Sequence, residues 1–552
     1  MKGDQPVRTF LKCLSRHPKT AMFVFGMIVA LPLVFDRLFF VGWISFLVPA
    51  YVEYTVPDSV NLKRHAYLRG FSFFMGFGIV LFSWFTELYP LDFTGLSRGG
   101  AAAVVAAGWF GLSALQASVK SFMFVILGIV SRRTGIRRSP AAFSGAFACL
   151  FVMFEWIEHQ TWAGVPWGNL AIGQASFLPM IQITSVLGSY AVTFILVFAG
   201  SLIGTGIAKL FASSPADVRP RTLRPFIAAL LLLSANIGFG CIRLATYSVP
   251  EGSRAVTAAA IQGNISSYEK WAEDSAERAY NVYESLTEEA AEAGAEFVVW
   301  PETPIVYNLS GDFGYEARSY YRAVSRENNV TLIAGAFTES ADGVEENSVV
   351  SVTPERGIDD TYYVKRRLVP FGEFVPLRSL VSEIYPPLSE LSVLADDLAA
   401  GTEPTVLETP LGAVSPIICF DSIYPELTRD SVRCGGELIT LSTNDSWFGN
   451  SAAGGEHNRH AVLRAVESGR YLIRAASTGI SSIITPTGRV DQSLGQSEYG
   501  FILSDVYMID ENTVYTTIGD ISVIASAAAF AVIVLLFSLD RKRLSDRGGD
   551  AH

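Results

Sequence analysis

The apolar residues of this chain gather in eight long runs, and these runs restrict the fold more than any other feature. Each run approaches or exceeds the roughly 20 residues that an α-helix needs to cross the hydrocarbon core of a bilayer. The runs cover 21–35, 38–56, 70–89, 101–130, 141–163, 177–207, 226–242 and 518–539. The composition agrees, with 50% of the 552 residues hydrophobic. We therefore predict a polytopic α-helical membrane domain with about eight spans.

Basic residues predict how these spans are oriented, because Lys and Arg are concentrated in cytoplasmic loops. They occur in the leader, in alternate loops and in the tail, at Lys2, Arg8, Lys12, Arg16, Lys19, Lys63, Arg64, Arg69, Arg132, Arg133, Arg137, Arg138, Lys209, Arg219, Arg221, Arg224, Arg541, Lys542 and Arg543. The leader resembles the start of a signal peptide, but no small-residue cleavage site follows, so we expect it to be retained. Eight spans then place both termini in the cytoplasm and residues 246–517 in the periplasm, which predicts a multi-pass protein of the bacterial inner membrane.

Near Ala255 the composition changes to that of a soluble domain. Strand-like runs at 256–261, 296–300 and 330–337 alternate with helical stretches at 272–293 and 315–327, which favours a layered α/β sandwich. We predict three parts: a membrane domain at 1–245 with about seven helices, a soluble domain at 246–517, and a last helix with a cytoplasmic tail at 518–552. The net charge of −11 gives no support for nucleic-acid binding, which needs a basic patch.

Cys419 follows Val414–Ile418, a run typical of a buried strand. A side chain at a strand end is held on rigid backbone at the rim of a sheet, so Cys419 is a candidate nucleophile. Two alternatives stay open: an inert core cysteine, or a disulfide with Cys434 in an oxidising compartment. The cysteines lack zinc-type spacing, and we expect His457 and His460 to be surface or packing residues rather than ligands, so no cofactor or metal is predicted.

Two further strand-end motifs lie upstream of Cys419. Glu302 follows the run 297–301, and Lys365 lies in the motif 362–373. A thiol needs a base or a nearby cation to act as a nucleophile at neutral pH; a lysine supplies the charge and a glutamate accepts the proton. The lysine can then stabilise the oxyanion that forms on an attacked carbonyl. Taken singly, Glu302 could start a helix and Lys365 could belong to a solvated basic cluster, but together the three residues suffice for acyl transfer through a thioester.

An ordered set of motifs runs along nearly the whole chain. It comprises Gly164–Trp167, Gln262–Ile265 with Trp271, Trp300–Glu302, Leu368–Glu373, Cys419, Asn444–Gly449, and Thr513–Tyr515 with Gly519. In this order the motifs resemble the nitrilase superfamily and, more narrowly, the bacterial apolipoprotein N-acyltransferase family. The resemblance implies a nitrilase-like αββα sandwich at 246–517 outside an eight-helix membrane domain.

The resemblance also implies roles for individual residues. Cys419 would be the nucleophile, Glu302 the general base and Lys365 the oxyanion partner. Glu373 would be a second essential carboxylate, and Trp271 would lie in the pocket. Phe420 and Asp421 occupy supporting positions where the family commonly has Tyr and Glu; the missing phenol removes one possible hydrogen bond, and the shorter acid keeps its charge but loses reach.

The implied reaction has two steps. Cys419 would take an acyl chain from a phospholipid, often phosphatidylethanolamine, and the thioester would pass it to the α-amine of the diacylglyceryl-cysteine of a lipoprotein. We expect a monomer that works at the lipid bilayer. Residues 374–398 could form either a lipid-touching lid or an ordinary core-packed helix. A membrane-anchored nitrilase-like amidohydrolase has the same triad and is the first alternative. A transporter or a non-catalytic binding scaffold is the second.

Overall fold

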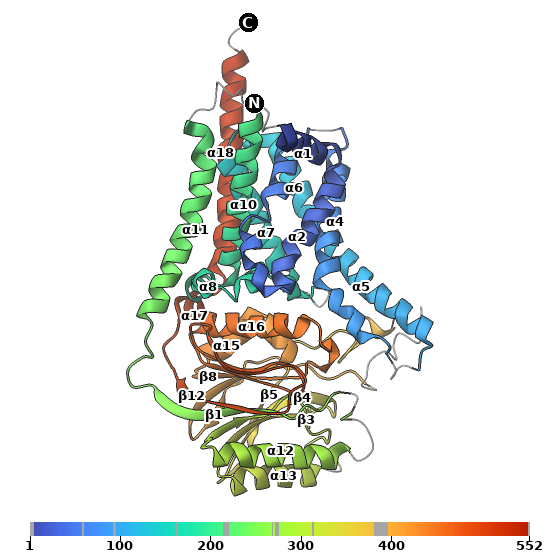
Figure 1. The fold of residues 1–552 in the computed structure, drawn as a ribbon, viewed down its shortest axis with the longest axis vertical. Helices are drawn as coiled ribbons and strands as arrows, with labels where there is room; N and C mark the ends of the chain where they lie inside the picture. The colour runs from blue at the N-terminus through green and yellow to red at the C-terminus, as the bar shows by residue number, and fades with distance from the viewer. Residues whose placement is uncertain are drawn as a thin grey trace. The chain divides into compact units, whose positions relative to one another are not determined.

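The computed structural model describes residues 5–57, 60–91, 95–161, 164–212, 220–267, 269–270, 275–311, 314–379, 383 and 396–549. The chain divides into two compact units (Figure 1). The first contains residues 1–85, 104–245 and 520–552, and the second contains residues 86–103 and 246–519.

The first unit is helical. Its long apolar helices overlap the predicted runs, but the basic leader, Pro166–Gly168 and Leu170–Gln174 are also helical and lie outside them. It contains α1 (Gln5–Arg16), α2 (Pro18–Val34), η1 (Asp36–Trp43), α3 (Leu47–Thr55), α4 (Leu62–Leu81), most of α5 (Arg98–Lys120), α6 (Phe122–Thr134), η4 (Ile136–Arg138), α7 (Pro140–Glu158), η5 (Pro166–Gly168), η6 (Leu170–Gln174), α8 (Leu178–Ile181), α9 (Thr184–Leu187), α10 (Ser189–Ala212), α11 (Pro220–Thr246) and α18 (Ile521–Gly549). The short helix η2 (Ser83–Leu88) is divided between the units, with residues 83–85 in the first and 86–88 in the second.

Among the described residues, six helices are long and apolar enough to cross a membrane. The number rises to seven if α1 and α2, which meet at an angle of 105°, form one bent span. The predicted count of about eight is therefore not confirmed. The run at 70–89 lies in α4 and η2, and α4 begins with the basic residues Lys63 and Arg64, which lower its hydropathy. The helices nevertheless make this a multi-pass membrane protein.

Two ion pairs are buried among the described residues of the first unit. Arg69 contacts Glu53 through two hydrogen bonds of 2.5 and 2.8 Å, and Lys120 Nζ lies 2.6 Å from Glu158. All four side chains are buried. A lone charge would be very costly in this setting, so the pairs account for charged residues within apolar helices.

The second unit is a sandwich of two six-stranded sheets. One sheet has the order β12-β1-β2-β3-β4-β5, from β1 (Arg254–Gln262), β2 (Phe297–Val299), β3 (Thr331–Glu339), β4 (Glu345–Thr353), β5 (Gly357–Val364) and β12 (Gly500–Met508). The other has the order β11-β10-β9-β8-β7-β6, from β6 (Leu407–Thr409), β7 (Gly412–Ile418), β8 (Leu438–Thr443), β9 (Leu472–Ala476), β10 (Ser481–Ile484) and β11 (Val490–Leu494). Helices α12 (Ser275–Glu292), α13 (Gly314–Glu327), α15 (Pro425–Arg433), α16 (Ala453–Ser468) and α17 (Val514–Ile518) complete the unit with η9 (Cys419–Ile423) and η10 (Ser446–Phe448).

The two faces of each sheet bury different residues because side chains alternate along a strand. Val256 and Ala258 of β1 face the second sheet in a core shared with Val414 and Ile418 of β7. Ala259 on the opposite face packs in a core with residues of α12 and α13. Figure 1 shows these two helices on one side of the paired sheets and α15 and α16 on the other. The predicted αββα sandwich is confirmed.

Strand direction brings several carboxyl ends to the same edge of this sandwich. In the first sheet β1, β2 and β3 are parallel, while β4 is antiparallel to β3 and β5 is antiparallel to β4. The carboxyl ends of β2 and β5 therefore share an edge with the amino end of β4. In the second sheet β7, β8 and β9 are parallel. Residues that follow these strands can meet although they are far apart in sequence.

Candidate active site

Cys419 is the first residue after β7 and begins η9. Its φ is +45°, in the left-handed region that residues with a Cβ seldom adopt. Such a conformation persists only where surrounding contacts impose it, and it is typical of functional sites. The side chain is partly exposed, and Cys419 and Cys434 are both free thiols. The disulfide alternative is therefore not what this structure contains.

Glu302 lies three residues beyond the end of β2, in a turn that passes very close to β3. A Cβ added to Gly335 of β3 would come within 2.4 Å of the Pro301 carbonyl oxygen and 2.9 Å of the Glu302 Cα. Only glycine allows this approach. The sequence of β3 thus sets where the Glu302 carboxylate lies.

Lys365 follows β5 and sits between two carboxylates. Its Nζ lies 2.8 Å from Glu302 Oε1 and 2.8 Å from Glu373 Oε1. Asn347, near the start of β4, donates to the same two oxygens at 2.7 and 2.8 Å. The Val369 backbone N–H donates to the other oxygen of Glu373 at 2.8 Å. The result is a buried, closely bonded cluster that fixes the lysine and both acids.

Charge within this cluster sets how the lysine and the thiol ionise. Burial alone would lower the pKa of Lys365, but Glu302 and Glu373 outweigh it and raise that pKa well above its usual value. Burial raises the pKa of the Cys419 thiol, the negative charge of Glu302 raises it further, and Lys365 opposes both effects. Cys419 is thus a thiol at neutral pH, and a nearby base must remove its proton during attack.

Asp421 is fully buried two residues after the candidate nucleophile. Its carboxylate accepts hydrogen bonds from the Tyr363 hydroxyl at 2.8 Å, the Arg367 backbone N–H at 2.8 Å and the Ile418 backbone N–H at 3.3 Å. Burial raises the pKa of Asp421 to about 6, although these bonds and Lys365 oppose the rise. The short acid therefore ties the turn that carries Cys419 to the loop that carries Lys365.

Lys270 is a second buried amine, and we did not predict it from the sequence. Its Nζ donates to the hydroxyl of Thr303 at 2.6 Å and to the carbonyl of Thr303 at 3.1 Å. Burial lowers the pKa of Lys270 to about 8, and repulsion from Lys365 adds to this, while Glu302 and Glu373 oppose it. Its contact with Thr303 supports the turn directly after Glu302.

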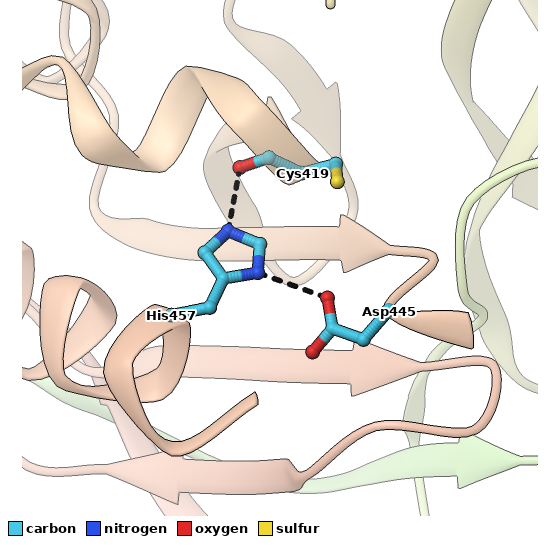
Figure 2. A group of neighbouring side chains, drawn as sticks. All are labelled: Cys419, Asp445 and His457. Carbon is cyan, nitrogen blue, oxygen red and sulfur yellow. Dashed lines mark hydrogen bonds and ion pairs between the residues drawn. The ribbon is translucent and has the colours of Figure 1, made fainter. Parts of the chain in front are cut away.

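Next to Cys419 lies a polar group formed by Asp445, His457 and Arg474. Figure 2 shows Asp445 and His457 of this group beside Cys419. Asp445 Oδ1 lies 2.9 Å from His457 Nδ1, and Arg474 donates to Asp445 Oδ2 at 2.6 Å. Burial opposes ionisation of Asp445, but Arg474 and His457 outweigh it and hold the pKa of this carboxyl well below its usual range.

One donor atom from each of Cys419, Asp445 and His457 falls within 4.8 Å of the other two, a set whose chemistry suits a divalent ion such as zinc. The guanidinium of Arg474, however, already contacts Asp445 and lies 3.0 Å from His457 Nδ1. A fixed positive charge in this place repels a metal cation. The group is therefore better described as a protein ion pair than as a metal centre.

The structure thus brings together the predicted residues Glu302, Lys365 and Glu373, and Cys419 lies close enough for Glu302 and Lys365 to shift the pKa of its thiol. Phe420 is buried, and its ring lies edge to face with that of Tyr424, with the ring centroids 5.5 Å apart. The predicted pocket residue Trp271 lies outside the described residues, as do 380–382 and 384–395 of the candidate lid.

Sequence reasoning missed three contributors, Asn347, Lys270 and Asp445. Asn347 could have been noticed as an amide directly before the small and apolar residues 348–353 of β4. Asp445 belongs to the motif 444–449, which is part of the resemblance but suggested no role for that residue. His457 was expected at the surface or in packing; it is fully buried, which agrees with packing and not with the surface.

Comparison with known proteins agrees with both units. Residues 257–513 match the carbon-nitrogen hydrolase family, and residues 25–202 match the apolipoprotein N-acyltransferase N-terminal domain. A mutant of the Nesterenkonia AN1 amidase from the nitrilase superfamily is 19% identical, with a TM-score of 0.37, over 50% of this chain and 99% of the amidase chain.

Two relatives are more similar in sequence. The apolipoprotein N-acyltransferase of Geobacter metallireducens is 32% identical over 71% of this chain and 73% of its own length. That of Gloeobacter violaceus is 31% identical over 88% of both chains. Together with the two domain matches, this similarity shows that the chain belongs to the apolipoprotein N-acyltransferase family.

Proposed function

We propose that this protein transfers an acyl chain from a phospholipid to the α-amino group of the diacylglyceryl-cysteine of apolipoproteins, through a thioester on Cys419. The chain is an acyltransferase of the nitrilase-like type. The observation that carries the proposal is a thiol on a strained turn, electrostatically coupled to a buried lysine held between two carboxylates. That arrangement provides a nucleophile, a base and an oxyanion partner.

In the first step Cys419 Sγ attacks the ester carbonyl of the phospholipid, and Glu302 accepts the thiol proton. Lys365 stabilises the negative oxygen of the tetrahedral intermediate. The intermediate expels the glycerol oxygen, which takes the proton from Glu302 and leaves as a lysophospholipid. The acyl chain remains on sulfur as a thioester.

In the second step the free α-amine of the acceptor attacks the thioester carbonyl. Glu302 takes a proton from the amine, and the sulfur leaves and is protonated again. Glu373 Oε1 accepts hydrogen bonds from both Lys365 and Asn347. The role of Glu373 and Asn347 is therefore to keep the lysine and the base in place through both steps.

We propose that the enzyme acts as a monomer in the bacterial inner membrane, with both termini in the cytoplasm and the unit containing Cys419 in the periplasm. The distribution of basic residues among the loops supports this orientation. Phosphatidylethanolamine is the proposed donor. Both substrates carry acyl chains held in a bilayer, which explains why a nitrilase-like domain is joined to membrane helices.

The test uses purified enzyme, phosphatidylethanolamine vesicles and a diacylglyceryl lipopeptide with a free α-amine. Mass spectrometry should detect the N-acylated lipopeptide together with one lysophospholipid per turnover. The same lipopeptide with an acetylated amine is the matched control and should give no product. Release of free fatty acid at the same rate with either peptide would favour the anchored amidohydrolase. Absence of any turnover would favour the binding scaffold.

A further inference from the structure

The proposed reaction gives no role to the polar group next to Cys419, yet that group contacts the backbone of the nucleophile. His457 Nε2 lies 3.1 Å from the carbonyl oxygen of Cys419, and Ser422 Oγ donates to the same oxygen at 2.8 Å. Ser422 Oγ also lies 2.9 Å from His457 Nε2. One carbonyl oxygen thus accepts hydrogen bonds from two side chains at the residue with the strained backbone.

We infer that His457 is a positioning residue. Held by Asp445, it donates a hydrogen bond to the Cys419 carbonyl and so keeps the turn that carries the nucleophile in its left-handed conformation. The inference rests on the proposed function, because it concerns how the thiol is presented for acyl transfer. The imidazole lies between the Cys419 carbonyl and the Asp445 carboxylate, one ring nitrogen toward each, as Figure 2 shows.

The arrangement is rigid because each member is bonded from more than one side. Asp445 accepts from Arg474 at 2.6 Å and from the Thr443 hydroxyl at 2.9 Å. A Cβ on Gly479 would come within 2.3 Å of Asp445 Oδ2, so the backbone at that glycine closes around the carboxylate. Asp445, His457 and Arg474 are all at most 1% exposed. Such a buried network fixes the ring in one orientation.

The consequence for catalysis follows from the geometry of the peptide group. The peptide between Cys419 and Phe420 is planar, so its C=O and its N–H point in opposite directions. Hydrogen bonds on the carbonyl therefore set the direction of the Phe420 N–H as well as the position of the Cys419 side chain. An N–H that is fixed before reaction can stabilise an oxyanion next to the attacked carbonyl without reorganisation.

The hydrogen bond to the carbonyl requires a proton on Nε2, because a carbonyl oxygen only accepts. At Nδ1, a proton would be donated to Asp445 Oδ1, whereas a lone pair would accept from the Arg474 guanidinium. The requirement for a proton on Nε2 distinguishes a positioning role of His457 from a role in core packing alone. Glutamine at position 457 can place an amide N–H near Nε2, whereas alanine and leucine cannot. We expect His457→Ala and His457→Leu to slow thioester formation about 10²-fold, with a similar KM for phospholipid, since misplacing reacting groups by about 1 Å has that effect. His457→Gln should stay within about tenfold of the wild type.

Two measurements are made on each full-length variant in detergent or vesicles. The first is the rate of acyl-enzyme formation from phosphatidylethanolamine, and the second is the rate of Cys419 alkylation by iodoacetamide. His460→Ala is the matched control, because His460 is a buried imidazole one turn further along α16. It should change both rates less than threefold.

Alkylation needs no lipid, so it keeps this inference separate from the proposed function. If wild-type enzyme forms no acyl adduct, the proposed function fails, while the alkylation rates of the variants still test the turn. The inference is supported if His457→Ala slows acyl-enzyme formation and alkylation of Cys419 and if His457→Gln restores both rates. Equal rates for wild type and His457→Ala, or an equal loss in the Ala and Gln variants, overturns it. If His457→Ala does not fold, Ser422→Ala is the deciding variant. A decrease of about tenfold in both rates supports positioning through the Cys419 carbonyl, and unchanged rates refute it.

Discussion

Replacing Glu302 by Gln separates two effects that the structure assigns to one carboxylate. Glu302 is the proposed base, and its negative charge also raises the pKa of the Cys419 thiol. Glutamine removes the base but lowers the thiol pKa. The change is nearly isosteric, and the glutamine carbonyl can still accept from Lys365 and Asn347, which now lie 2.8 and 2.7 Å from Glu302 Oε1. The fold should therefore be retained, and thermal unfolding checks this.

The expected magnitude follows from the resting state of the thiol. Even at its ordinary value near 9, the thiol would be only about 1% ionised at pH 7, and burial raises its pKa from there. The base is therefore needed, and loss of general-base catalysis slows reactions about 10²–10⁴-fold. This corresponds to about 3–5 kcal/mol of activation free energy, and we expect acyl-enzyme formation at pH 7 to fall by that factor.

The pH dependence of acyl-enzyme formation distinguishes loss of the general base from a structural distortion of the site. In the Gln variant the thiolate must form without help, so the rate of acyl-enzyme formation should rise about tenfold per pH unit between pH 7 and 9. The wild-type rate should rise far less steeply. Rapid-quench mass spectrometry measures both rates with phosphatidylethanolamine as donor. A variant within threefold of wild type at pH 7, or two parallel pH profiles, would refute the assignment of Glu302 as base.

Three further substitutions test how the site and the helices are held. Asp421→Asn keeps one acceptor for three donors and should lower the free energy of unfolding by about 1–3 kcal/mol. Because the pKa of Asp421 is raised to about 6, the protonated carboxyl group stabilises the folded state in acid, and this stabilisation is lost as the pH rises through 6. The loss of unfolding free energy in the variant should therefore be larger at pH 4 than at pH 7, as measured by thermal unfolding. Lys120→Met leaves the buried carboxylate of Glu158 alone and should destabilise the protein by about 3–5 kcal/mol, while the double variant with Glu158→Gln should recover part of the loss. Gly335→Ala should push the Glu302 turn away and reduce activity at least tenfold, whereas Gly455→Ala, where an added Cβ meets no atom within 4 Å, should leave activity unchanged in the same assay.

Local sequence pattern predicted the layers of the soluble unit well. The strands expected at 256–261 and 330–337 correspond to β1 and β3, and the helix expected at 315–327 corresponds to α13. Apolar strands and amphipathic helices are specified by residues close in sequence, so the spacing of their apolar residues can be recognised in the sequence. The number of spans was harder to predict, because α4 combines basic residues with an apolar second half.

The candidate site was only half visible in the sequence. Glu302, Lys365 and Cys419 follow strands, which makes them recognisable one by one. Asn347 and Lys270 join the site only because strand pairing brings separate segments to one edge, and no local pattern encodes that meeting. The resemblance supplied Glu373, whose bond to Lys365 then explains why a second acid is present.

The most direct test of the account is to locate the acyl group on the enzyme. Full-length protein is incubated with phosphatidylethanolamine and no acceptor, digested, and analysed by peptide mass spectrometry. The account predicts one acyl-sized mass increase on the peptide containing Cys419, its removal by a diacylglyceryl lipopeptide with a free amine, and no adduct in Cys419→Ala. An acyl group on another residue, or lipopeptide acylation by Cys419→Ala, would contradict it.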